Sequence, residues 1–464
     1  MRGVRGRYPI RIEGLRLSRS IKRFPAFAAC VTMKIMEKRK HNTKNQASRP
    51  QNCPYSKECG ACSHVNMPYS RQLERKQEYI ARLFEREISQ GCVLEPILGM
   101  ECPWGFRNKI VSPFAVEKRK PASRTAKSGS KGKASRRAPG RARAEGILHG
   151  MYARGSHRII RLDSCPVEHE SGRKVVKAVA QIMARYGVPA YDEEAGTGFM
   201  RHVLVRVGHN SGEVLVVLVT NGREFTGSKN FAKELVKRCP EITTIVQNVN
   251  TRQTNVILGE EDRVLYGPGF ILDTLCGLSF RISPRSFYQV NARQTEALYL
   301  TAIDWALEDA SGAHGVESIM DAYCGTGTIG LVAASRSKNA RVVGVDKVED
   351  AIRDAKKNAA HNGIENAEFV AADAGAFLRE RAAQGERFDV LLMDPPRAGS
   401  SEEFLRAVAE SGVGRVAYIS CNPETQARDA RILDGLGYKA KRIRAVDMFP
   451  HTDHVENVML FERA

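Results

Sequence analysis

Cys421 occupies a position from which a cysteine could act as a nucleophile. It follows the strand-like run RVAYI and precedes Asn422 and Pro423, and proline ends a strand. Open α/β sheets bind their ligands at the carboxyl ends of their strands, so this thiol is expected at a ligand-binding edge. A thiolate there could form a covalent intermediate with a substrate. A lone cysteine at a strand end could also be an inert apolar side chain.

Four more cysteines have a spacing that suits metal binding. Cys53, Cys59 and Cys62 form the pattern C-x5-C-x2-C, and Cys165 follows in a Cys-Pro dipeptide. Four thiolates can hold zinc tetrahedrally or an iron–sulfur cluster, and the spacing does not separate the two. The chain has 11 cysteines in 464 residues. We read no export signal, so a reducing compartment is expected, where clustered thiols serve metal binding or catalysis.

A glycine-rich loop and two acidic residues predict a nucleotide-like cofactor pocket. Gly325, Gly327 and Gly330 fit GxGxxG after the strand-like run ESIMDAY. Asp346 ends the next strand, where a carboxylate can bind a ribose hydroxyl pair. These features fit a dinucleotide site, an AdoMet site or a purely structural turn. Asp394 starts a rigid Asp-Pro-Pro turn that is similar to the Pro-Pro turns of AdoMet-dependent methyltransferases and is not usual in dehydrogenases.

The elements that must position these residues alternate between strands and helices. Five short apolar runs after about residue 290 are separated by helix-length segments, namely ESIMDAY, ARVVGVD, AEFVAAD, FDVLLMD and RVAYISC. This alternation predicts a doubly wound parallel sheet of the α/β class. Between 200 and 285 the strand-like runs HVLVRVG and EVLVVLVT, joined by a short Asn-Ser-Gly linker, predict a hairpin in an α+β region.

Five motifs in one order resemble the RNA uracil-C5 methyltransferase family, whose members make 5-methyluridine in RNA. They are SFYQVN at 286–291, DAYCGTGTIGL, DPPRAG, SCNPETQARD and HTDHVE. The resemblance runs from about Cys53 to the C-terminus and is greatest to the bacterial 23S rRNA branch, which carries a [4Fe–4S] cluster. It implies a C-terminal Rossmann-like AdoMet-dependent methyltransferase domain and a central α+β domain with an iron–sulfur cluster.

The resemblance also implies roles for individual residues. Cys421 would be the nucleophile and Glu456, in HTDHVE, the general base. The residues expected to contact AdoMet are Gln289, Tyr323, Asp346 and Asp394, with Thr328 and Asp373 as further candidates. Tyr323 could instead be a core aromatic residue and Asp373 a helix cap. Cys53, Cys59, Cys62 and Cys165 would hold the [4Fe–4S] cluster, in a structural or RNA-positioning role.

A thiol suits this chemistry because C5 of uracil is a poor nucleophile. Addition of a thiolate to C6 creates an enolate whose charge reaches C5, and C5 can then attack a methyl group. A base must remove the C5 proton before the thiolate leaves. The uridine must be unpaired or flipped out to reach such a pocket.

Several neighbours of these motifs have two possible roles. Arg397 could hold an RNA phosphate or be a surface charge. Phe287 and Tyr288 could stack on the uridine, although core packing is the expectation. His451 and His454 flank the base, and we expect them to pack rather than to bind a metal.

The basic charge is concentrated in two segments. The chain has a net charge of +20, of which residues 1–50 carry +12 and residues 118–143 carry +11. Such segments could add nonspecific RNA affinity or be solvated tails. We predict a basic extension over 1–52 without a β-barrel RNA-binding module, a central domain over 53–285 with a basic insertion at 117–145, and a methyltransferase domain over 286–464.

The predicted protein is a cytoplasmic monomer without a membrane span that acts on 23S rRNA. The acid-poor leader also resembles an organellar transit peptide, and translation could start at Met33 or Met36. Three other functions compete: a tRNA uracil-C5 methyltransferase, a noncatalytic iron–sulfur protein that binds RNA or assists ribosome assembly, and an amine methyltransferase. Cys421 argues against the last two, because neither needs a nucleophilic thiol.

Overall fold

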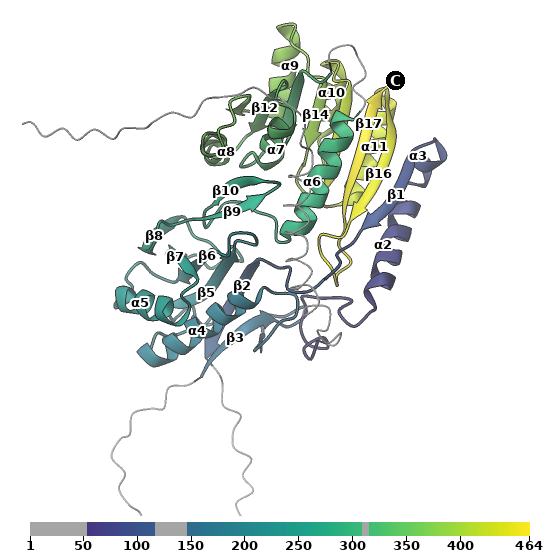
Figure 1. Ribbon diagram of the computed structural model, residues 1–464. Coiled ribbons are helices and arrows are strands. Elements are labelled where there is room, and N and C mark those ends of the chain that lie inside the picture. Colours follow the sequence, from purple (N-terminus) through teal and green to yellow (C-terminus); the bar gives the residue numbers. More distant parts are fainter. Residues whose placement is uncertain (1–52, 117–145, 309–314) are drawn as a thin grey trace, which may run out of the picture. The chain divides into compact units, whose positions relative to one another are not determined.

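The computed structural model describes residues 53–116, 146–308 and 315–464 (Figure 1). Pro50–Ala464 form one compact unit. The predicted extension at 1–52 and the insertion at 117–145 lie outside the described residues, as does their expected part in RNA affinity. Within the described ranges, no helix is both long enough and apolar enough to cross a membrane.

An eight-stranded sheet carries the C-terminal part of the chain. Its order is β1-β16-β17-β15-β14-β11-β12-β13, and β13, β12, β11, β14 and β15 are mutually parallel. The bounds are β1 Val93–Leu98, β11 Ser318–Ala322, β12 Arg341–Asp346, β13 Ala367–Ala371, β14 Val390–Met393, β15 Arg415–Ser420, β16 Tyr438–Val446 and β17 Glu456–Arg463. The five predicted parallel strands are therefore confirmed, and the antiparallel β16 and β17 are additions to them.

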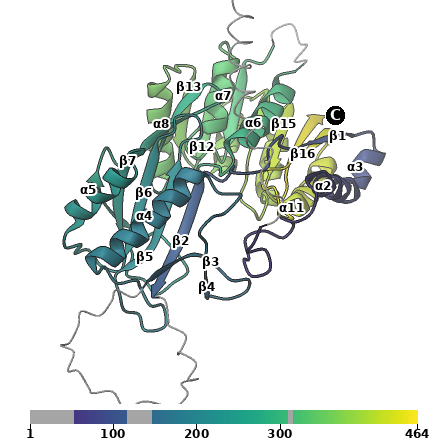
Figure 2. The ribbon, with the colours of Figure 1, turned by 60° about the horizontal axis from the view of Figure 1, so that its bottom comes forward.

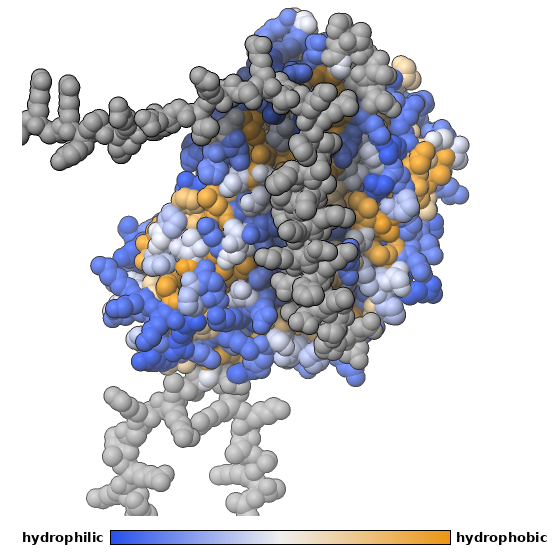
Figure 3. Space-filling model, in the orientation of Figure 1, coloured by the Kyte–Doolittle hydropathy of each residue, from blue (hydrophilic) through white to orange (hydrophobic). Residues whose placement is uncertain are grey.

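Helices cover both faces of this sheet and bury an apolar cluster on each. One cluster includes side chains of α6 Ala292–Leu307, α7 Thr328–Arg336 and α8 Glu349–His361. The other includes side chains of α2 Tyr69–Leu83, α9 Ala374–Ala383, α10 Glu402–Glu410 and α11 Pro423–Gly435. Apolar strands buried on both faces are typical of parallel sheets. The face of the molecule in Figure 3 is mainly hydrophilic, with its apolar residues in separate patches.

The segment from α2 to β1 packs on the C-terminal sheet. β1 pairs in parallel with β16, and α2 lies beside β1 in Figure 1, followed by α3 Glu85–Ser89. Ile80 and Phe84 are fully buried in the core of this sheet. The prediction assigned this segment to the central domain. The sequence could not show this packing, because an apolar helix face does not reveal which sheet it will cover. The domain boundaries themselves stay a prediction.

A seven-stranded sheet forms the central part, in the order β4-β3-β2-β5-β6-β7-β8. Helices α4 Glu170–Tyr186 and α5 Ser228–Arg238 lie against it (Figure 2) and share one core with it. The strands are β2 Lys109–Val116, β3 Ile147–Tyr152, β4 Ile159–Arg161, β5 Met200–Val207, β6 Val214–Thr220, β7 Ile242–Val249 and β8 Glu261–Tyr266. The predicted hairpin is the antiparallel pair β5 and β6. A separate pair, β9 Ile271–Leu275 and β10 Leu278–Ile282, contacts α8.

Candidate functional site

One cavity of about 1240 Å³ collects all the residues predicted to bind the cofactor or to react. Its wall includes Gln289, Tyr323, Thr328, Asp346, Asp373, Asp394, Cys421 and Glu456. Most of them follow the carboxyl ends of β11, β12, β13, β14 and β15, the edge at which parallel sheets bind ligands. The volume exceeds the ~300–1,000 Å³ of common ligand pockets, so more than one ligand can fit.

The turn that carries Cys421 is held to the neighbouring Pro-Pro turn. Cys421 follows the last residue of β15, and the Asn422 side chain caps α11 by accepting a hydrogen bond from the Glu424 N–H at 3.3 Å. Asn422 Nδ2 also donates to the carbonyl of Arg397 at 3.2 Å, and Thr425 Oγ1 donates to the same carbonyl at 3.3 Å. The turns after β14 and β15 are therefore fixed relative to each other.

Strand register brings Glu456 opposite Cys421. β15 and β17 are antiparallel, and their last pair joins Ser420 to Asn457. One further step in the same register aligns Cys421 with Glu456, the first residue of β17, where the two strands separate. The Asn457 side chain donates to Gln426 Oε1 of α11 at 2.7 Å, which supports the strand next to the carboxylate.

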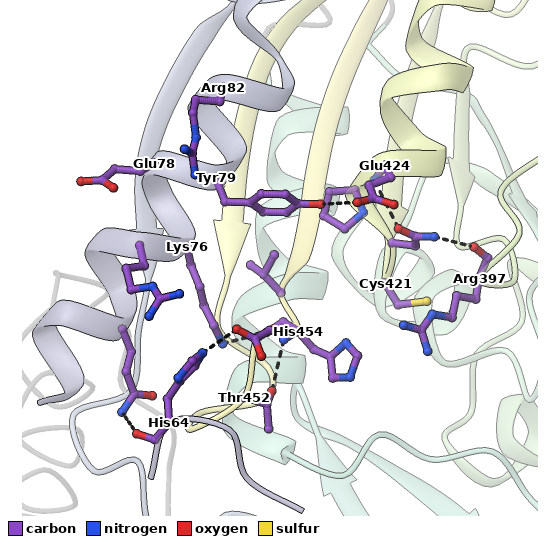
Figure 4. A pocket seen from close by; sticks show the side chains of 16 residues that line it. His64, Lys76, Glu78, Tyr79, Arg82, Arg397, Cys421, Glu424, Thr452 and His454 are labelled. Atoms are coloured by element: carbon purple, nitrogen blue, oxygen red, sulfur yellow. Dashed lines mark hydrogen bonds and ion pairs between the residues drawn. The ribbon is translucent and has the colours of Figure 1, made fainter. Parts of the chain in front are cut away.

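Three ionisable groups at this point have raised pKa values. Burial raises the pKa of Asp394 to about 7, and burial together with the Asp394 carboxylate raises the pKa of Glu456 to about 8. Burial, Glu456 and Asp394 raise the pKa of the Cys421 thiol to about 11, while Arg397 acts in the opposite direction. Figure 4 shows the Cys421 sulfur beside the Arg397 side chain. A cation bound near the two carboxylates would offset their effect on the thiol.

The glycine-rich loop is tightly bent under the cavity. Gly327 has φ +78°, and a Cβ added there would lie 2.8 Å from the Phe369 ring, so a side chain does not fit. Tyr323 also has a positive φ of 62°, a strained conformation for a tyrosine that is most often found at functional sites. Its half-buried ring packs edge-on against Phe404, with the ring centroids 5.3 Å apart. Tyr323 is therefore a cavity-lining residue as well as a packed aromatic one.

Two of the three acidic residues predicted to bind the cofactor, Asp346 and Asp373, have backbone partners. Asp346 accepts hydrogen bonds from the N–H groups of Gly325 at 3.0 Å and Val348 at 2.9 Å, which ties the end of β12 to the glycine loop. Asp373 caps α9 through the Ala376 N–H at 2.8 Å, as its alternative role predicted. Lys347, 2.9 Å from Asp373, together with this cap lowers the pKa of that carboxyl.

The remaining cavity residues include one prediction that was wrong. Thr328 begins α7, with its Oγ1 3.5 Å from Tyr299 Oη. The carbonyl of Gln289 accepts from Asn108 Nδ2 at 3.0 Å. Phe287 is not a core residue, since it is 70% exposed on the cavity wall, whereas Tyr288 packs in the core and donates to Asp273 at 3.1 Å.

Helix α2 holds the loop that leads to Glu456, a role that the sequence did not reveal. Lys76 is buried and donates to Asp447 at 2.6 Å and to the carbonyl of His454 at 2.7 Å. Gln72 accepts from the His451 N–H at 2.9 Å. The His451 ring stacks on Trp104 at 4.0 Å, so His451 packs as expected. Polar residues on a helix face normally indicate solvent exposure, so only the buried apolar positions of α2 could be foreseen.

The four predicted cluster cysteines line one small cavity of about 20 Å³. Four thiols are the donor set that iron–sulfur clusters use, so the residue types fit the predicted group. Their arrangement does not confirm it, because no three His, Cys, Asp or Glu side chains of the described residues converge closely enough to hold a metal ion.

Comparisons with known proteins agree on the class. A family model described as a methyltransferase domain matches residues 314–431. An uncharacterized RNA methyltransferase of Halalkalibacterium halodurans is 41% identical over 411 residues, 88% of this chain and 82% of that protein. Another, of Caldanaerobacter subterraneus, is 35% identical over 435 residues, 93% and 87% of the two chains.

A solved structure extends the comparison to three dimensions. The tRNA (uracil-54, C5)-methyltransferase of Pyrococcus abyssi, in complex with S-adenosyl-L-homocysteine, aligns with a TM-score of 0.66 and 28% identity. The alignment covers 87% of this chain and 86% of that chain, so both the central and the C-terminal sheets contribute to the likeness.

Proposed function

This chain belongs to the RNA uracil-C5 methyltransferase family, and we propose that it methylates C5 of a uracil in RNA through a covalent bond between Cys421 and C6. RNA methylation with AdoMet as the donor follows from the family. The observation that carries the finer proposal is the shared register of β15 and β17, which aligns a thiol and a carboxylate on the wall of one cavity. Neither a noncatalytic RNA-binding protein nor an amine methyltransferase needs that pair.

The proposed reaction balances with these two residues. The Cys421 thiolate adds to C6, and the electron pair of the C5–C6 double bond moves to the C4 oxygen. C5 then forms a bond to the methyl carbon of AdoMet as the bond between that carbon and the sulfonium breaks. Glu456 takes the C5 proton, the double bond re-forms, and the thiolate leaves. The positive charge that AdoMet would supply in this cavity would offset the effect of Asp394 and Glu456 on the thiol and favour the thiolate before this addition.

The methyl donor would lie against the glycine loop. Gln289, Tyr323, Asp346 and Asp394 would bind it, with Thr328 and Asp373 as further contacts, because all six line the cavity. The cavity is large enough to hold the donor and a flipped uracil together.

For the substrate, we favour 23S rRNA over tRNA, with the protein acting as a cytoplasmic monomer. The support is the set of Cys53, Cys59, Cys62 and Cys165, which would hold a [4Fe–4S] cluster as in the ribosomal branch of the family. The cluster would keep the loops before α2 in place, and no step of the methyl transfer passes through it. The tRNA-acting structural neighbour keeps tRNA as the competing substrate.

A trapping experiment tests the covalent mechanism. Fluorine at C5 cannot leave as a proton, so 5-fluorouridine-containing 23S rRNA with AdoMet should accumulate a denaturation-resistant protein–RNA adduct. Cys421→Ala should abolish the adduct. Cys324→Ala is the matched control, because Cys324 is a second, more deeply buried thiol on the same cavity wall, and this variant should still form the adduct. An adduct that survives in Cys421→Ala would refute the mechanism.

A further inference from the structure

A second cavity opens on Cys421. It has a volume of about 470 Å³ and shares Cys421 and Arg397 with the cavity described above (Figure 4). Its other lining residues come from α2, from the start of α11, from the loop before β17 and from His64 before α2, and they include Arg75, Tyr79, Arg82, Glu424 and His454. We call this cavity the α2 groove. The sulfur of Cys421 therefore lies where two cavities meet.

The α2 groove carries three arginines suited to bind an anion, of which Arg75 also attracts the Asp453 carboxylate and lowers its pKa. Arg75 and Arg82 are exposed and lie seven residues apart, so they share one face of α2 with Tyr79 between them. Arg75, Arg82 and Arg397 form no ion pair within 4 Å of a carboxylate in the described part of the chain. Arginine forks of this kind suit phosphate groups.

The acidic residues of the α2 groove repel a bound anion only weakly, because each has a partner or points away from Cys421. Asp453 is 2.5 Å from His64 Nε2, and Glu424 accepts a hydrogen bond from Tyr79 Oη at 3.3 Å. In Figure 4, the Glu78 side chain points away from Cys421. Lys76, also a lining residue, forms an ion pair with the Asp447 carboxylate.

We propose that the α2 groove binds the RNA backbone on one side of the target uridine, with Arg75, Arg82 and Arg397 on its phosphates. This inference rests on the proposed function. A flipped nucleotide stays linked to the RNA strand on both sides. The RNA backbone must therefore lead away from Cys421 in two directions. The methyl donor would fill part of the larger cavity, and the α2 groove also opens at Cys421. The Tyr79 ring offers a face on which an adjacent base can stack.

The test compares the salt dependence of RNA binding in two charge-matched variants. Binding of a single-stranded oligouridylate to the full chain is measured by fluorescence anisotropy over a range of KCl concentrations. For a single strand, each phosphate that the protein no longer neutralises makes the slope of log affinity against log salt less steep by ~0.7, so Arg75→Gln/Arg82→Gln should reduce it by about 1.4. Arg71→Gln/Arg406→Gln removes the same charge from arginines that are paired with Glu74 and Glu402 outside the α2 groove, and should keep the wild-type slope.

The outcomes separate this inference from the function beneath it. A wild-type slope in Arg75→Gln/Arg82→Gln overturns the proposal that the α2 groove binds RNA. A loss of S-adenosyl-L-homocysteine affinity without a change in slope overturns it as well. Formation of the 5-fluorouridine adduct in the wild-type protein shows, independently of the slope, whether the proposed function stands.

Discussion

The carboxyl edge of the eight-stranded sheet and the four-cysteine loops both gather residues that are distant in sequence, but they hold them differently. Cys421 and Glu456 lie at the end of the paired strands β15 and β17, and side-chain hydrogen bonds from Asn422 and Thr425 to the Arg397 carbonyl fix the turn that carries Cys421. The loop from Cys53 to Cys62 is held by local turns, such as the Cys59 N–H to the Tyr55 carbonyl at 2.8 Å, and by contacts with residues 153–163, which include the Cys59–Ala153 bridge and a hydrogen bond from the Asp163 N–H to the Tyr55 hydroxyl at 3.3 Å. The positions of Cys421 and Glu456 are thus set by strand pairing, whereas the proposed cluster would add a constraint that the cysteine loops otherwise lack.

The largest effect is expected from the base at the sheet edge. Glu456→Gln keeps the shape of the residue but removes its ability to accept the C5 proton, so turnover should fall by about 10²–10⁴-fold. The adduct should then accumulate on ordinary RNA, measured as protein that migrates with RNA in a denaturing gel. A variant that loses turnover without trapping RNA would contradict the assigned role.

A smaller effect is expected where the edge binds the methyl donor. Asp346→Asn removes a negative charge next to the glycine loop and would weaken the proposed charge-assisted hydrogen bond to the donor, so donor affinity should fall by about 10–100-fold. Isothermal titration with S-adenosyl-L-homocysteine measures this change. Asp350→Asn, also on the cavity wall but in an exposed part of α8, is the comparison variant and should lose less. Equal losses of donor affinity in the two variants would contradict the proposal that Asp346 binds the donor.

Much of this edge was predictable because its geometry is local. Apolar runs such as RVAYI define strands, and residues that follow parallel strands must meet at one edge, so Cys421, Asp346 and Asp394 could be grouped from sequence. The pairing of β17 with β15 is nonlocal, and only the resemblance supplied Glu456. The burial of Lys76 and Gln72 and the exposure of Phe287 depend on which elements pack together, which no periodicity in the sequence reports.

The coupling between carboxylates predicts a pH dependence. Burial and Asp394 raise the pKa of Glu456 to about 8, so this carboxyl is largely protonated at neutral pH and becomes a base as the pH rises. We expect kcat/KM to rise through the pKa of Glu456, about 8, and to continue rising toward the pKa of the Cys421 thiol, about 11. Asp394→Asn removes the neighbouring charge, lowers the pKa of Glu456 and should move the rise to lower pH, whatever its effect on the maximal rate. A move to higher pH would contradict the coupling.

Substitutions in the cysteine loops are expected to have the smallest effect on ligand binding at the sheet edge. Cys62→Ser should reduce the iron and sulfide content of anaerobically purified protein but change S-adenosyl-L-homocysteine affinity less than about 3-fold, because the cysteine cavity and the donor cavity share no lining residue. Cys239→Ser, a buried cysteine of the central core, should keep the iron. Iron-free wild-type protein, prepared anaerobically, would contradict the proposed cluster.

Peptide mapping tests the central claim most directly, because it identifies the atom that bonds to RNA. After trapping with 5-fluorouridine RNA, nuclease treatment and trypsin digestion, mass spectrometry should find the nucleotide mass on the peptide over residues 416–428, whose one cysteine is Cys421. Fragmentation should place it on that sulfur. A nucleotide attached to another peptide, or a methylated product formed at the full rate by Cys421→Ala protein, would contradict the account.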